Sequence, residues 1–252
     1  MPNLSFVFLD CATSAESSHL PDQPVKTASI IKLPILVHAL MCAAEGAAAL
    51  DEPMTLTEAI KTPGMGVLKG LSAGVSLPLR DVCWLMTAIS DNTATNLLIE
   101  RFGVDAINAR SRALGLERTT LFRKVFAPNA AHHAQFGLGA TTPHEMANLL
   151  ARIHARALAD APTCDLILNM LAAQQDRTMI PRYLPEGWHY AGKTGADDDL
   201  RNDCGIITRP DGRAFVLAAF CQNLPAPDWS VDNPGAVAIA QLARRVLNVN
   251  GS

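Results

Sequence analysis

The sequence contains few aromatic residues and no run of basic residues, two features that argue against several classes of partner. Phe, Trp and Tyr make up 5% of the 252 residues, and 21 Lys and Arg against 24 Asp and Glu give a net charge of −3. Nucleic-acid and anionic-membrane binding usually requires a basic face, and single-strand binding requires stacking aromatics. We therefore expect neither a nucleic-acid partner nor a membrane partner.

Long apolar runs and an export signal are also missing. No stretch approaches the roughly 20 apolar residues that span a bilayer. The first residues, MPNLSFVFLDCATS, lack a basic start followed by an apolar core, so they are typical of a strand rather than of a signal peptide. We expect a cytoplasmic protein, and nothing in the sequence indicates its oligomeric state.

The cysteines are scattered and form no metal-binding pattern. There is no C-x-x-C pair, and no His lies at ligand spacing from a pair of cysteines. In a chain of this length without an export signal, such cysteines are typical of reduced thiols in the core. We expect no metal, no organic cofactor and six free thiols, at Cys11, Cys42, Cys83, Cys164, Cys204 and Cys221.

The order of the predicted elements indicates an α+β fold in a single domain. Hydrophobic residues make up 49% of the chain, enough for a large core. A first strand at Asn3–Asp10 is followed by many helices, then three strands and a last helix, without βαβ alternation. We expect one sheet from residues of about 1–28 and 175–252, beside a helical lobe at about 29–174.

Individual elements follow from apolar periodicity and from capping residues. The middle of the chain predicts helices at Ala28–Ala44, Leu79–Ile89, Thr93–Phe102, Val104–Leu114, Pro143–Leu158 and Asp165–Ala173. The last part predicts strands at His189–Thr194, Cys204–Arg209 and Arg213–Gln222, and a helix from Asn233 to about Leu247. Pro210-Asp211-Gly212 is a turn signal between the last two strands.

Ser29 and Lys32 form the first chemically suggestive pair. Three residues apart at a helix start, they place an amine one turn from a hydroxyl on the same face. A serine hydroxyl becomes a nucleophile when a neighbouring base removes its proton, and a lysine can do so if its pKa is depressed. The helix start also offers the Ser29 amide to a developing oxyanion.

Two further motifs follow in the chain. Ser90-Asp91-Asn92 lies between two predicted helices, where short polar side chains can face a cleft and Asp91 can cap the second helix. Lys193-Thr194-Gly195 is predicted to end a strand, and Gly195 would allow close approach of a substrate backbone.

The three motifs, in this order, resemble the set found in serine β-lactamases and penicillin-binding proteins. The segments ASIIKLPIL, GVLKGL, LRDVCWLMTAISDNTATN and TTPHEMANLL are similar to class A β-lactamases, and the resemblance extends over roughly Leu4 to Leu247. It implies a five-stranded antiparallel sheet flanked by helices, an all-helical lobe, and a site in the cleft between them.

The resemblance also implies roles for single residues. Ser29 matches the acylated nucleophile, Lys32 its base, and Ser90 the hydroxyl that passes a proton to the leaving nitrogen. Asn92 matches the amide that holds substrate, and Lys193 and Thr194 match the pair that binds a substrate carboxylate. Ala196 matches the second oxyanion amide. Arg201 is a candidate for the substrate carboxylate, or else part of a solvated hairpin tip.

One departure from the family concerns deacylation. Class A enzymes carry a Glu in the loop before the T-T-P helix, but residues 119–143 here contain no Asp or Glu. At the expected distance before Thr142 stand Arg123, Lys124, Val125 and Phe126. His132, His133 or a neutral Lys32 could replace this base, or the natural acyl-enzyme needs none.

These observations predict a serine hydrolase that cleaves an amide, lactam or ester through an acyl-Ser29 intermediate, most simply a class A-type β-lactamase acting on a small molecule. Two alternatives stay open. One is a cytoplasmic esterase or amidase for a small metabolite or peptide. The other is a penicillin-binding sensor or sink that turns over slowly or not at all, which the missing Glu favours.

Overall fold

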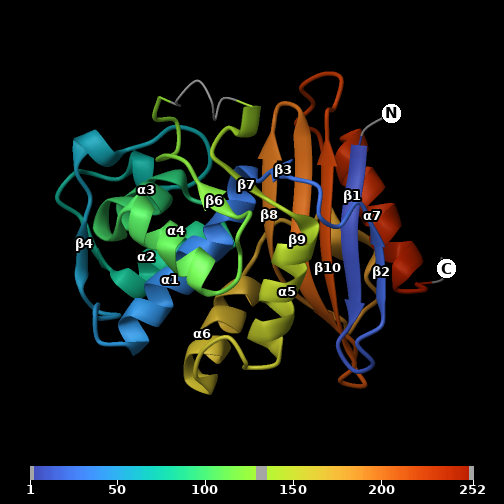
Figure 1. Ribbon diagram of the computed structural model, residues 1–252. Helices are drawn as coiled ribbons and strands as arrows, with labels where there is room; N and C mark the ends of the chain where they lie inside the picture. The colour runs from blue at the N-terminus through green and yellow to red at the C-terminus, as the bar shows by residue number, and fades with distance from the viewer. Residues whose placement is uncertain (1–2, 129–134, 250–252) are drawn as a thin grey trace.

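A five-stranded antiparallel sheet organises the computed structural model, which describes residues 3–128 and 135–249 (Figure 1). The strand order is β2-β1-β10-β9-β8. Each neighbouring pair is antiparallel, as the prediction required. The strands are β1 (Asn3–Asp10), β2 (Glu16–His19), β8 (His189–Asp197), β9 (Leu200–Thr208) and β10 (Ala214–Gln222).

The strands differ from the sequence prediction in two places. β8 continues to Asp197 and β9 begins at Leu200, so Lys193-Thr194-Gly195 lies inside a strand and not at its end. Asp197 pairs with Leu200 across a short turn, and this ladder keeps Gly195 and Ala196 extended. The prediction also missed β2, because its sequence ESSH is exposed throughout and carries no apolar alternation.

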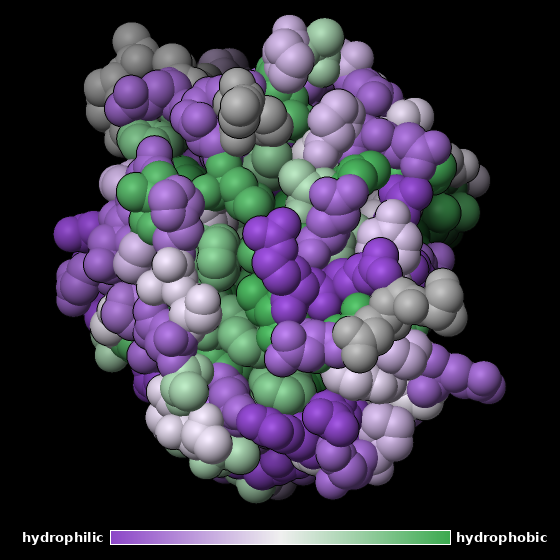
Figure 2. All heavy atoms as spheres, turned by 90° about the vertical axis from the view of Figure 1, so that its right-hand side faces the viewer, coloured by the Kyte–Doolittle hydropathy of each residue, from purple (hydrophilic) through white to green (hydrophobic). Residues whose placement is uncertain are grey.

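Helices cover both faces of this sheet. α7 (Pro234–Val246) packs on one face, and α5 (Pro143–His154) and α6 (Ala161–Ala172) lie on the other (Figure 1). The main core lies between the sheet and the larger group of helices, and a second core lies under α7. On the α7 side, the molecular surface mixes hydrophilic and hydrophobic side chains (Figure 2).

The remaining helices follow the predictions closely. They are α1 (Lys32–Ala44), α2 (Leu79–Ala88), α3 (Asn92–Phe102) and α4 (Val104–Ala113). α5 stops at His154, four residues before its predicted end, and α6 begins four residues earlier than expected. The early start of α6 is explained by Asp160, whose carboxylate accepts a hydrogen bond from the Thr163 amide and caps the helix.

Short elements complete the fold. They are the paired strands β3 (Val25–Lys26), β6 (Thr120–Leu121) and β7 (Gly139–Thr141), the pair β4 (Pro53–Thr55) and β5 (Ser76–Pro78), and the 3-10 turns η1 (Ala28–Ile31), η2 (Glu58–Ile60), η3 (Leu68–Gly70) and η5 (Ile180–Tyr183). All six cysteines are unpaired. The helices that the structure describes are too short or too polar to span a bilayer. The division into two lobes at residues 28 and 174 stays a prediction.

Candidate active site

Ser29 lies on η1, the 3-10 turn that leads directly into α1. Its neighbour Ala28 has a φ of +42°, in the left-handed region that alanine seldom adopts. Strand β8 runs against this turn: a Cβ on Gly195 would lie 2.8 Å from the Thr27 carbonyl oxygen and 3.2 Å from the Ile30 nitrogen. Only glycine at position 195 therefore lets the strand pass this close to Ser29.

Side chains of the sheet hold the segment just before Ser29. Asn202, which pairs with Gly195 in the ladder, donates from Nδ2 to the carbonyl oxygens of Lys26 (2.9 Å) and Thr27 (3.1 Å). Gln222 accepts from the Lys26 amide and donates to the Asn202 side chain. Asn202 is fully buried, so these bonds are shielded from water and fix the turn that presents Ser29.

Lys32 is buried, with 1% of its surface exposed, and its amine is surrounded by acceptors. Nζ donates to the Ser90 carbonyl (2.8 Å), to Ser90 Oγ (3.0 Å) and to Asn92 Oδ1 (2.9 Å). Burial and the nearby charge of Lys193 lower the pKa of Lys32 well below its ordinary value. Burial thus disfavours the charged form of Lys32, which is the direction of pKa shift that a base requires.

Ser90 links the two lysines of the site. Its Oγ accepts from Lys32 and also from Lys193 Nζ, at 3.1 Å. A hydroxyl has two acceptor lone pairs and one proton, so both lone pairs are engaged and the proton is left for a third group in the cavity. Ser90 has a φ of +58°, a left-handed conformation that turns the chain sharply between α2 and α3.

Asp91 maintains this sharp turn and does not line the cavity that Ser90 and Asn92 line. One carboxylate oxygen caps α3 through the Ala94 amide (2.9 Å), and the other accepts from the Val67 and Leu68 amides (2.6 and 2.9 Å). Gly66 packs against it so closely that a Cβ there would lie 2.2 Å from the Asp91 Cγ. The predicted capping role of Asp91 is confirmed.

Lys193 lies inside β8 and is as buried as Lys32. Its Nζ donates to Ser90 Oγ and to the Thr194 carbonyl, at 2.8 Å. Burial lowers the pKa of Lys193 to about 8, although the carboxylates of Asp176 and Asp203 oppose that shift. Lys193 is therefore largely charged at neutral pH, and its Nζ lies within hydrogen-bond reach of Ser90 Oγ.

Tyr190 and Asp203, on the same two strands as Lys193 and its ladder partner, form a buried hydrogen-bonded pair. Tyr190 donates its hydroxyl proton to Asp203, which also accepts from the Ile180 amide at 2.9 Å. Burial raises the pKa of Asp203 to about 7. Gly192 and Gly205 leave room for the Tyr190 ring, since a Cβ on either would lie 2.2–2.3 Å from its atoms.

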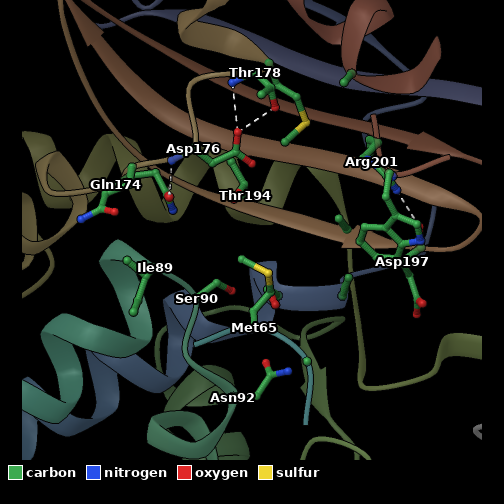
Figure 3. Close-up of a pocket in the computed structure, with 18 of the residues that line it drawn as sticks. Met65, Ile89, Ser90, Asn92, Gln174, Asp176, Thr178, Thr194, Asp197 and Arg201 are labelled. Carbon is green, nitrogen blue, oxygen red and sulfur yellow. Dashed lines mark hydrogen bonds between the residues drawn. The ribbon is translucent and has the colours of Figure 1, made fainter. Parts of the chain in front are cut away.

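The motif residues line or adjoin one cavity of about 720 Å³ (Figure 3). It is bounded by η1, by the bend between α2 and α3, and by strands β8 and β9. Its lining includes six of the nine predicted site residues: Ser29, Ser90, Asn92, Thr194, Ala196 and Arg201. Lys32 and Lys193 reach it through their hydrogen bonds to Ser90, and Gly195 holds the strand against η1. The structure therefore brings the three motifs to one place.

Arg201 is more engaged with protein than the sequence suggested. Its guanidinium donates to the carbonyl oxygens of Asp197 (2.6 Å), Leu200 (2.7 Å) and Asp228, and it lies 4.7 Å from the centre of the Trp229 ring. Only 5% of its surface is exposed. It stabilises the turn between β8 and β9, and its contact with a substrate carboxylate stays a prediction.

Of the four residues found in place of the expected Glu, three line the cavity: Arg123, Val125 and Phe126. Arg123 is committed to the loop, because its guanidinium donates to the carbonyls of Gly137, Lys124 and Ala127. Val125 is fixed by the buried Asn96, which accepts from the Val125 amide (2.8 Å) and donates to its carbonyl (3.2 Å). His132 and His133, the other candidate bases, lie outside the described residues.

Sequence reasoning missed one polar wall of the cavity, in which Asp176 is the charged member. Gln174, Asp176 and Thr178, between α6 and η5, face Ser90 and Asn92 across the opening (Figure 3). They belong to no motif, and their place depends on how α6 packs against β8 rather than on local spacing. Among residues 3–128 and 135–249, no group of three or more His, Cys, Asp or Glu side chains could hold a metal ion.

Comparisons with known proteins show what the whole chain is similar to. A family model described as "Beta-lactamase enzyme family" matches residues 2–249. The chain is 31% identical to the β-lactamase of Sphaerobacter thermophilus, with a TM-score of 0.88 covering 100% of this chain and 94% of that one. It is 28% identical to a penicillin-G acyl-enzyme of the PBP-A mutant L158E, with a TM-score of 0.87 covering 98% and 89%. A curated relative, the "Beta-lactamase regulatory protein BlaB" of Streptomyces cacaoi, is 25% identical over 96% of this chain and 91% of its own.

Proposed function

The chain belongs to the β-lactamase enzyme family, and from that premise we propose that it is an acylating serine hydrolase whose nucleophile is Ser29. The comparisons confirm the predicted family and fold. They also support the predicted reaction type, that of a serine hydrolase of the β-lactamase type. The observation that carries the residue assignment is the Lys32–Ser90–Lys193 chain of hydrogen bonds beside Ser29.

In the proposed acylation step, Lys32 reacts in its neutral form, which keeps only two of the three hydrogens that the ammonium donates to Ser90 and Asn92. Ser29 Oγ attacks the carbonyl carbon of a lactam, amide or ester while its proton passes to Lys32 Nζ. The C–O bond forms and the negative charge on the carbonyl oxygen is stabilised by the amides of Ser29 and Ala196. When the tetrahedral intermediate collapses, the bond to the leaving nitrogen, or to the leaving oxygen of an ester, breaks. Ser90 then gives that atom its proton and regains one from Lys32.

We further propose that penicillin acyl-enzymes of this protein hydrolyse slowly. Deacylation needs a base for the attacking water, and none of the cavity-lining residues in the loop at 123–126 is an acid. A stoichiometric sensor or sink is the second candidate, and it has one specific support: a relative aligned over nearly its whole length is named a regulatory protein.

The test is mass spectrometry of the intact protein after exposure to benzylpenicillin, nitrocefin and p-nitrophenyl acetate. We expect a covalent adduct that Ser29→Ala abolishes, with little change in thermal stability because Ser29 is only half-buried. Ser230→Ala is the matched control, since Ser230 lines the same cavity. An adduct that persists in Ser29→Ala and disappears in Ser230→Ala would overturn the assignment.

A further inference from the structure

Asp176 places a fixed carboxylate on the wall of the cavity that holds the predicted anion site. Its Oδ1 accepts from the Thr178 amide (3.0 Å) and the Thr178 hydroxyl (2.7 Å). Its own amide donates to Gln174 Oε1 at 3.0 Å, and Gln174, which is 4% exposed, donates to the Thr87 carbonyl. Asp176 is thus held at its side chain by Thr178 and at its backbone amide by Gln174, and it lines the cavity (Figure 3).

This carboxylate acts on the cations that would receive a substrate anion. Burial lowers the pKa of both Lys193 and Arg201, and the charge of Asp176 opposes that lowering at each, at Arg201 after the larger effect of Asp228. Lys193 additionally gives two of its three ammonium hydrogens to Ser90 and Thr194, and Arg201 is bonded to three carbonyls. Both cations are therefore partly satisfied by the protein itself.

The other charged groups that line the cavity supply no further cation for a substrate carboxylate. Asp197 and Asp198 stand at the tip of the β8–β9 hairpin, and Arg123 is bonded to three carbonyls of its own loop. A substrate carboxylate entering near Thr194 would meet Lys193 together with the negative charge of Asp176. Close like charges are unfavourable, more so in a cavity partly shielded from water.

The rim of the cavity suits a different kind of substrate. Four large apolar side chains line it and are exposed by 61–64%: Met65, Phe126, Trp229 and Val231. Exposed apolar groups gathered at a cavity mouth are typical of a binding surface for an apolar substituent.

From these observations we propose that Asp176 is a specificity-determining residue, which selects apolar esters or amides that carry no carboxylate beside the bond that reacts. The inference rests on the proposed function, because it concerns the substrate of acylation at Ser29. This substrate class differs from the carboxylate-bearing substrates that Lys193 and Thr194 alone would favour.

The test compares nitrocefin with its methyl ester, two lactams that share a chromophore and differ in one carboxylate. The acylation rate constant of each is measured from the pre-steady-state burst at pH 6.5, where Lys193 is charged. Asp176→Asn keeps an oxygen that can accept from Thr178 and removes the charge. We expect it to accelerate acylation by the free acid about tenfold, equivalent to about 1.4 kcal/mol, and to change the methyl ester less than twofold.

Two further variants separate charge from structure. Asp198→Asn removes one negative charge from the exposed hairpin tip of the same cavity, and we expect it to change the acid-to-ester ratio less than twofold. Asp176→Ala lacks the hydrogen bonds to Thr178 but must shift the ratio in the same direction as Asp176→Asn. An unchanged ratio in both Asp176 variants would overturn the inference while leaving the proposed function intact. Absence of any Ser29-dependent burst with either substrate would overturn both.

Discussion

Val125 is the position where a single carboxylate should convert slow deacylation into turnover. Val125 lines the same cavity as Ser29, and its backbone amide and carbonyl are both hydrogen-bonded to the Asn96 side chain. Asn96 is 5% exposed, so these hydrogen bonds are sheltered from water. We expect Val125→Glu to place a base near the acyl-Ser29 carbonyl without moving the loop.

The size of the effect follows from general base catalysis, which typically contributes about 10²–10⁴-fold. We expect the deacylation rate constant for benzylpenicillin to rise at least about 100-fold, which corresponds to about 2.7 kcal/mol of barrier. Val125 is half-buried, so the new carboxylate should cost about 1–2 kcal/mol of stability and lower the Tm by a few degrees. The acyl-enzyme lifetime is measured by intact mass spectrometry after removal of excess penicillin.

Val125→Gln is the matched control, because it has the same length and polarity but no basic oxygen. We expect its acyl-enzyme to last as long as that of the unchanged protein. Equal lifetimes for the Glu and Gln variants would refute the placement of Val125. Fast hydrolysis of penicillin by the unchanged protein, without a burst, would show that another base already serves.

Two further predictions concern charge and packing. Lys193 has a pKa of about 8, so acylation by free-acid nitrocefin should fall, relative to its methyl ester, as pH rises through about 8 and Lys193 loses its proton. Dividing the two rate constants removes any effect of pH that the two substrates share. In Asp176→Asn the midpoint of the ratio should move to lower pH, because the charge of Asp176 raises the pKa of Lys193. A ratio that stays constant from pH 6 to 9 would contradict an anion-binding role for Lys193. Gly66→Ala should destabilise the protein by about 3 kcal/mol or more and slow acylation, because a Cβ would collide with Asp91 at a φ of +107°. Denaturant unfolding measures the loss of stability. Gly70→Ala is the control and should change stability little, because nothing lies within 4 Å of a Cβ at that position.

Local chemistry made most of the site predictable from the sequence. Ser29 and Lys32 are three residues apart on one turn, and Ser90, Asp91 and Asn92 share one bend, so their relative positions depend on few backbone angles. The capping residues Asp91, Thr142 and Asn233 likewise marked where helices begin. Such signals act within a few residues and need no tertiary context.

The features that sequence reasoning missed depend on distant contacts. Asp176 lines the same cavity as Thr194 because α6 packs against β8, and no local spacing encodes that packing. The end of β8 was misplaced because glycine and a run of acids are typical of a turn, whereas pairing with β9 keeps residues up to Asp197 extended. β2 is likewise held by its pairing with Phe6–Leu9 and not by its own composition.

The position of β1 in the sheet has a consequence for how the chain folds as it is synthesised. β1 lies between β2 and β10, and Asp10 pairs with Phe215. At translation rates of about 5–20 residues per second, roughly 10–40 seconds separate the appearance of these two partners. During that time the apolar strand LSFVFLD has only the polar β2 beside it.

The helices α1 to α6 all lie between β1 and β8 in the sequence, so they are synthesised during this interval. Much of their shared core can therefore form before β10 completes the sheet. The step that completes the sheet is the arrival of β10, which pairs with both β1 and β9. Chains interrupted before Ala214 therefore expose an unpaired apolar strand edge, the kind of surface that aggregates or recruits chaperones.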